Sequence, residues 1–147
     1  MPQIMLTEHI EAPVEEVFAY LTDPTNEIEW ISSAREREIV EGDGGKGTRF
    51  RAVDQFLAKR IDFVYEVTEH DAPNRYAYRV VEGPFPGLID VTLTSEEGGT
   101  TLTFDANADA GFKGFFGKLT EPIVTRVFER DTSADLAKLK ALVEARS

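Results

Sequence analysis

The stretch "EAPVEEVFAYLTDPTNEIEWIS", residues 11–32, decides the fold. Its first half carries four apolar residues at the spacing i, i+3, i+4 and i+7: Val14, Val17, Phe18 and Leu21. This spacing predicts a short helix with one apolar face. Asp23-Pro24 then ends the helix, because the residue before a proline avoids the α region. A second short helix follows and ends near Trp30, so the stretch predicts a bent unit of two short helices.

Seven segments around this unit alternate apolar and polar residues, as half-buried β-strands do. They are residues 3–10, 34–42, 47–56, 60–70, 75–81, 88–96 and 100–110. Short turns separate the last five, and all of them except residues 57–59 contain Gly, Asn or Pro, which predicts an antiparallel meander. One face of most segments is apolar and the other polar, so we expect a sheet covered on one side only. Residues 34–42 are more polar and are predicted to form an edge or well-solvated strand.

The C-terminal part of the chain, from about residue 114 to 145, has a helical pattern. Its apolar stripe consists of Leu119, Ile123, Val127, Phe128, Leu136, Leu139, Leu142 and Val143. Pro122 is expected in the first turns of this helix or at a kink. A helix of ~30 residues spans roughly 45 Å, enough to cross a whole curved sheet. The predicted fold class is α+β: a single domain over residues 1–147, with a curved antiparallel sheet of about six to seven strands around a long C-terminal helix.

The composition limits the classes of partner. The chain has 147 residues, with 16 Lys and Arg against 27 Asp and Glu, and a formal net charge of −11. This charge repels nucleic acid and anionic membranes. The N-terminus lacks the pattern of a signal peptide, and no apolar run approaches the ~20 residues that span a bilayer. We therefore expect a cytoplasmic protein with no nucleic-acid partner and no membrane insertion, and leave a homodimer open.

Several stretches resemble the START/SRPBCC superfamily, which includes the birch-pollen-type allergens and the polyketide cyclase/dehydrase-like proteins. They are "IEAPVEEVFAYLTD" followed by "IEW", "GKGTRFRA", "YEVTEHDAPNRYAYRV", "GGTTLTFDANAD" and the final "LKALVEARS". The resemblance implies a helix-grip fold whose cavity, between sheet and long helix, binds lipids, sterols, polyketides or plant hormones. Some members cyclise or dehydrate polyketides, and others bind partner proteins. The chain has no Cys and lacks the Cys and His ligands of the Rieske oxygenases that share this fold, so we expect no metal and no cofactor.

A long helix resting on a curved sheet leaves concave space, which predicts an apolar binding cavity. The expected lining is Trp30, Phe50, Phe63, Tyr65, Tyr76, Tyr78, Val91, Phe104, Phe116, Leu119, Ile123 and Val127. The alternative is plain core packing, in which these side chains meet and leave no room. Trp30 has two interpretations that are compatible: it stacks on an aromatic ligand, or it anchors the two short helices in the core.

No catalytic set can be assembled from spacing, and three residues are the candidates for a catalytic role: Asp54, Tyr65 and Tyr78. Asp54 shares strand parity with Phe50 and Phe56, so it points inward if the alternation holds. A carboxylic acid held there could donate or accept a proton. The alternative is a bulge that leaves Asp54 in solvent. The two histidines are not promising: the pattern does not fix the face of His9, and His70 is expected to be exposed.

Three functions are compatible with these features. The first is binding of an aromatic, polyketide or lipid-like molecule in the sheet–helix cavity. The second is a polyketide cyclase or dehydratase, which needs a shaped cavity and one or two proton-transfer groups. The third is a protein-interaction module that uses the outer helix or the sheet edge.

Overall fold

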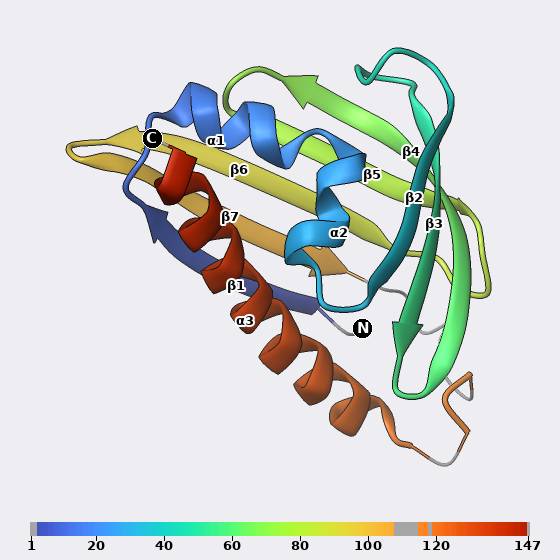
Figure 1. Ribbon diagram of the computed structural model, residues 1–147. Coiled ribbons are helices and arrows are strands. Elements are labelled where there is room, and N and C mark those ends of the chain that lie inside the picture. Colours follow the sequence, from blue (N-terminus) through green and yellow to red (C-terminus); the bar gives the residue numbers. More distant parts are fainter. Residues whose placement is uncertain (1–2, 108–114, 118, 147) are drawn as a thin grey trace.

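The computed structural model describes residues 3–107, 115–117 and 119–146 (Figure 1). The elements follow the order β1 (Gln3–Ile10), α1 (Val14–Leu21), the 3-10 helix η1 (Pro24–Asn26), α2 (Glu27–Trp30), β2 (Ala34–Glu41), β3 (Arg49–Phe56), β4 (Lys59–Asp71), β5 (Arg75–Glu82), β6 (Leu88–Glu96), β7 (Gly99–Asn107) and α3 (Glu121–Arg146). These elements form an α+β helix-grip fold, with two short helices after the first strand and one long C-terminal helix. The predicted fold class is confirmed.

The seven strands form one antiparallel sheet in the order β1-β7-β6-β5-β4-β3-β2. Strands β1 and β2 therefore lie at opposite edges of the sheet, although they are neighbours in the chain. The helices α1 and α2 carry the chain across the concave face between these two edges (Figure 1). This crossing explains why the helical stretch comes before most of the strands.

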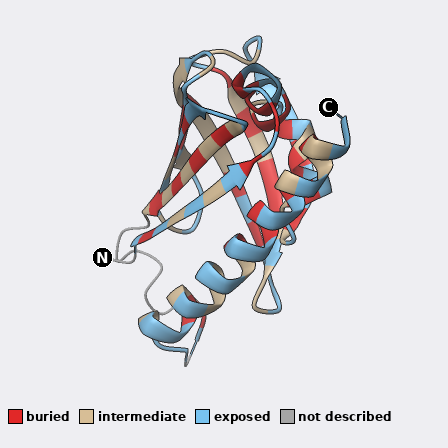
Figure 2. Cartoon of the chain, turned by 90° about the vertical axis from the view of Figure 1, so that its left-hand side faces the viewer, coloured by how far each residue is buried: buried red, intermediate tan, exposed pale blue. Residues whose placement is uncertain are grey.

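The core lies between the concave face of the sheet and the helices. All four residues of the predicted α1 face are buried, as are Ile4 and Ile10 of β1. Burial alternates along most strands, which Figure 2 shows as alternating colours. In α3 the buried positions are concentrated in the second half, where Leu136, Leu139 and Val143 pack into the main core. None of the described helices is long and apolar enough to cross a membrane.

The start of the long helix differs from the prediction. Helix α3 begins at Glu121, whereas residues 115–117 form a turn in which Gly117 has a φ of 69°. Pro122 lies in the first turn, where its missing N–H is tolerated. A helix that began earlier would place Pro122 in its interior, where the proline removes a backbone hydrogen bond and clashes with the preceding turn. Residues 108–110, predicted at the end of the last strand, and residue 114, the predicted helix start, lie outside the described residues.

Three residues in the first half of the predicted apolar stripe do not face inward, whereas Phe128 does. Leu119 precedes the helix and Ile123 is 49% exposed, while Val124 is buried. The inward face is set by the spacing of Val124 and Phe128 with the buried residues of the second half, and Ile123 and Val127 lie about 100° away from it. The prediction counted the helical period from Leu119, which lies before the helix, and so it placed Ile123 and Val127 on the inward face.

Candidate functional site

A cavity of about 180 Å³ lies between the first half of α3, the α2–β2 connection and the concave face of the sheet. Its wall is mostly apolar, with aromatic rings from four strands and from the segment before α3. Six of the expected lining residues border it: Trp30, Phe63, Tyr65, Tyr78, Phe104 and Phe116. Among the described residues the cavity therefore lies where the sheet–helix geometry predicts it, and core packing does not fill the whole concave face.

The other six expected lining residues lie elsewhere. Phe50, Tyr76 and Val91 are on the inward face as expected, but they are buried in the main core with residues of α1 and the second half of α3. Leu119 and Ile123 are exposed, and Val127 is half-buried on the side of the helix. Strand parity identifies the inward face but not which end of it a helix covers. The helices fill one end of the concave face and leave the other open.

Contacting aromatic rings run from the cavity wall into the core. The ring centroids of Phe63 and Tyr65 are 5.3 Å apart, and those of Tyr65 and Tyr78 are 4.9 Å apart. Such edge and tilted contacts hold the rings in fixed orientations. Burial raises the pKa of both Tyr65 and Tyr78, because a phenolate would lose its hydration. Their hydroxyls are therefore neutral hydrogen-bond donors at ordinary pH and not bases.

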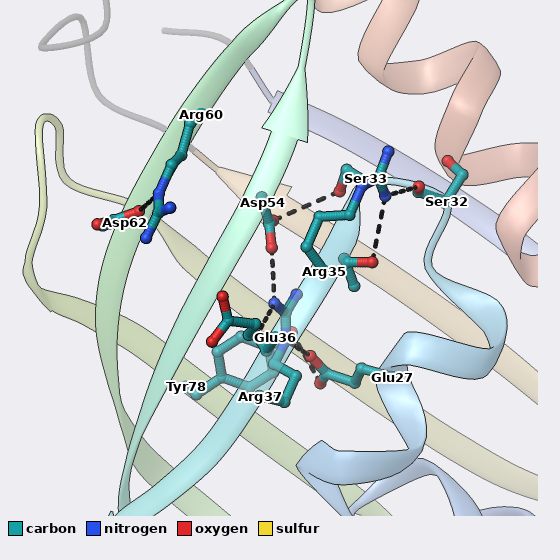
Figure 3. A network of polar contacts seen from close by, with 11 residues as sticks. Glu27, Ser32, Ser33, Arg35, Glu36, Arg37, Asp54, Arg60, Asp62 and Tyr78 are labelled. Carbon is teal, nitrogen blue, oxygen red and sulfur yellow. Dashed lines mark hydrogen bonds and ion pairs between the residues drawn. The ribbon is translucent and has the colours of Figure 1, made fainter.

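A buried ionic network lies beside the cavity (Figure 3), and two of its members, Arg37 and Asp54, line it. Arg37 of β2 donates from Nε to Oε1 of Glu27 at 2.7 Å and from Nη1 to Oδ1 of Asp54 at 2.6 Å. The side chains of Arg37 and Glu27 are 3% and 2% exposed, and that of Asp54 is 15% exposed. The network thus places one guanidinium between two carboxylates, and Asp54 is the most exposed of the three.

The electrostatics of the network are dominated by burial. Burial raises the pKa of the Glu27 carboxyl, and Arg37 only partly opposes this effect. Burial alone would lower the pKa of Arg37, but the charges of Glu27 and Asp54 raise it, so the guanidinium keeps its proton. The hydroxyl of Tyr78 lies 3.5 Å from Oε2 of Glu27. The charge of Arg37 is therefore already matched by carboxylates of its own chain.

Asp54 points into the cavity wall, as strand alternation predicts, and not into solvent. It pairs with Ile61 in an uninterrupted β3–β4 ladder, so no bulge moves it into solvent. Asp54, Tyr65 and Tyr78 all border the same cavity. The three catalytic candidates from the sequence are thus brought together, although their geometry alone assigns no reaction.

Arg37 and Glu27 were missed by the sequence reasoning. The register shift between Ala34 and Glu36 breaks the period of two in β2, so alternation does not show that Arg37 turns inward. Asp135 was missed as well, but the sequence did carry a signal. It lies four residues before Leu139 and eight before Val143, on the buried face of α3.

The wall of the cavity formed by α3 is also acidic. Asp135 is buried and its Oδ1 accepts the backbone N–H of Ser32 at 3.0 Å. Burial raises the pKa of this carboxyl, while the bond from Ser32 opposes the shift. Two buried polar atoms in the lining, Trp30 Nε1 and Asn107 Oδ1, have no hydrogen-bond partner in the described part of the chain.

Neither histidine borders the cavity. His9 is 46% exposed in its side chain, on the outer face of β1. His70 is half-buried rather than exposed, because its ring packs edge-on against Phe18 with centroids 5.1 Å apart. No group of three or more His, Asp or Glu side chains is placed to hold a metal ion within the described residues.

The comparisons with known proteins agree with this architecture. A family model described as "Polyketide cyclase / dehydrase and lipid transport" matches residues 1–144. The chain belongs to this family. The predicted resemblance to the START/SRPBCC superfamily is thereby confirmed. No curated protein matches this chain.

Solved structures share the fold of this family member at low sequence identity. The protein TTHA0849 from Thermus thermophilus has a TM-score of 0.82 at 22% identity, with 99% of each chain covered. A START superfamily protein from Mycobacterium smegmatis has a TM-score of 0.80 at 12% identity, also with 99% of each chain covered. The Zhui aromatase/cyclase from a Streptomyces species has a TM-score of 0.77 at 23% identity, covering 98% of this chain and 94% of its own. At these identities the likeness shows the fold alone.

Proposed function

We propose that this chain binds an apolar, ring-containing small molecule in the cavity between its sheet and α3. The observation that carries the proposal is an unfilled space of about 180 Å³ with a mostly apolar, aromatic wall. An engineered apolar cavity of about 150 Å³ in another protein binds benzene, so the space here suits one substituted ring. The family description, which names polyketides and lipid transport, supports a ligand of this chemistry.

The experiment is to weigh the purified protein by mass spectrometry under native and then denaturing conditions. A mass excess that disappears on denaturation would reveal a bound molecule and give its mass. If the masses agree, the protein is titrated with ethylbenzene, and binding is followed by changes in the amide NMR signals of residues that border the cavity. No mass excess together with no response of those signals would refute the proposal.

The alternative, a cyclase or dehydratase, is favoured by the convergence of Asp54, Tyr65 and Tyr78 on the cavity. The neutral Tyr65 hydroxyl would donate a hydrogen bond to a substrate carbonyl, and the Asp54 carboxylate would accept a proton from the adjacent carbon. The Tyr78 hydroxyl could add a second donor only by turning from Glu27. An Asp54→Asn variant that still binds substrate would then lose about 100-fold or more in turnover. An unchanged turnover would remove Asp54 from this mechanism. A cytoplasmic location stays a prediction of the sequence, and a homodimer stays open.

A further inference from the structure

The polar part of the cavity wall has a strong bias in charge. Three carboxylates border the cavity: Asp54, Asp131 and Asp135. Arg37 is the one Lys, Arg or His residue among the lining residues that the structure describes. A ligand whose polar end meets this wall therefore faces more negative than positive charge.

The positive charge of Arg37 is not available to a ligand anion. Glu27 and Asp54 both accept hydrogen bonds from it within 2.7 Å. These three groups together carry one positive and two negative charges, so the network has a net charge of −1 when all are ionised. A third carboxylate brought to Arg37 would be repelled by the two already there.

The carboxylates on α3 strengthen the bias. Asp135 is 8% exposed, and no salt bridge joins it to a described Lys or Arg. Asp131 is paired with Arg130 at 3.2 Å, but the Arg130 side chain is 74% exposed and its charge is screened by water. The cavity wall thus presents acceptors that a desolvated donor can satisfy and an anion cannot.

Asn107 is a further polar residue of the cavity wall. Its side-chain oxygen is buried and has no hydrogen-bond partner among the described residues. A buried acceptor without a partner is costly, but this oxygen has no surface open to the cavity, so a ligand donor reaches it only if the amide turns. Trp30 Nε1 is a donor buried in the same way, so the selectivity rests on the charge of the carboxylates and not on these two atoms.

We infer that the cavity selects a ring-containing molecule whose polar group is a hydrogen-bond donor, a hydroxyl or an ammonium, and that it excludes carboxylates of the same shape. Asp54, Asp131 and Asp135 are the residues that set this selectivity. The inference rests on the proposed function, because it concerns the polar group of a ligand held in that same cavity.

The test compares four probes built on one ring: ethylbenzene, 4-ethylphenol, 4-ethylbenzylammonium and 4-ethylbenzoate. Their dissociation constants are measured at neutral pH by NMR titration of the whole chain. We expect 4-ethylphenol, 4-ethylbenzylammonium or both to bind at least about tenfold more tightly than 4-ethylbenzoate. Binding of 4-ethylbenzoate as tight as that of the better donor probe would overturn the inference, even if ethylbenzene binds. If none of the four binds, the proposed function fails together with it.

Matched variants locate the selectivity. Asp135→Asn keeps an oxygen for the Ser32 N–H and removes one negative charge from the wall. We expect it to weaken the discrimination against 4-ethylbenzoate by about threefold or more. Glu97→Gln removes the same charge from an exposed turn between β6 and β7 and should leave the ratio unchanged. Equal ratios in the wild type and both variants would overturn the role assigned to Asp135.

Discussion

Arg37 is the residue on which the polar wall depends. Replacing it by Met leaves Glu27 and Asp54 facing each other without a cation, and removal of one partner of a buried ion pair typically costs about 3–5 kcal/mol. We expect Arg37→Met to lower the free energy of unfolding by that amount, measured by urea denaturation at neutral pH. The loss should shrink as the pH falls. Arg37 lowers the pKa of Glu27, so without Arg37 the buried carboxyl takes up a proton at a higher pH and its unpaired charge disappears.

Two variants control this measurement. Arg60→Met removes an exposed partner of Asp62 and should change the stability far less than Arg37→Met does, because water screens this pair. The double variant Glu27→Met with Arg37→Met also removes the buried carboxylate of Glu27. It should therefore recover part of the stability that Arg37→Met alone loses. An Arg37→Met variant no less stable than Arg60→Met would show that the network is not a buried ionic site.

At the scale of single elements, the β3–β4 hairpin carries local strain. Its two turn residues, Leu57 and Ala58, have φ values of 51° and 63°, although neither is Gly, Asn or Asp. The left-handed region costs an L-residue roughly 1–2 kcal/mol, and a glycine avoids this cost. Glycine is also more flexible in the unfolded chain, which cancels about half of the gain in stability. We expect Ala58→Gly to raise the free energy of unfolding by about 0.5–1 kcal/mol, measured by thermal and urea denaturation.

The same substitution in a helix provides the control for the hairpin. Ala134 is exposed in the middle of α3, where Gly is about 1 kcal/mol worse than Ala. Ala134→Gly should therefore destabilise the protein while Ala58→Gly stabilises it. Two losses of similar size would mean that the turn imposes no cost on Ala58.

The elements also show where sequence reasoning stops. The α1 face and the inward residues of β4 were predictable, because their side chains follow an unbroken period of 3.6 or 2. The inward turn of Arg37 was not, since a register shift in β2 changes the face of the strand. The start of α3 was misplaced because apolar residues before Pro122 continue the helical spacing without forming a helix.

For the whole molecule, the sequence predicted a sheet gripping a helix but not how the concave face is divided. The division depends on where α1 and the second half of α3 come to rest, which is a long-range property of the fold. Phe50 and Phe63 are both phenylalanines on the inward face of a strand, yet the first is in the main core and the second borders the cavity. Local periodicity treats them alike, so it predicted both as lining.

The same division predicts losses of different size when side-chain volume is added at two buried alanines on the inward face. Ala106 borders the cavity, whereas Ala52 is fully buried and does not. Overpacking a filled core costs about 1–3 kcal/mol, so Ala52→Leu should lose that much stability in urea denaturation. Ala106→Leu can place its extra carbons in the open space and should cost less than about 1 kcal/mol, while weakening the binding of ethylbenzene. Equal losses of stability in the two variants would show that the space beside Ala106 is closed to added side-chain atoms. A smaller loss of stability in Ala106→Leu with unchanged ethylbenzene binding would place the ligand elsewhere.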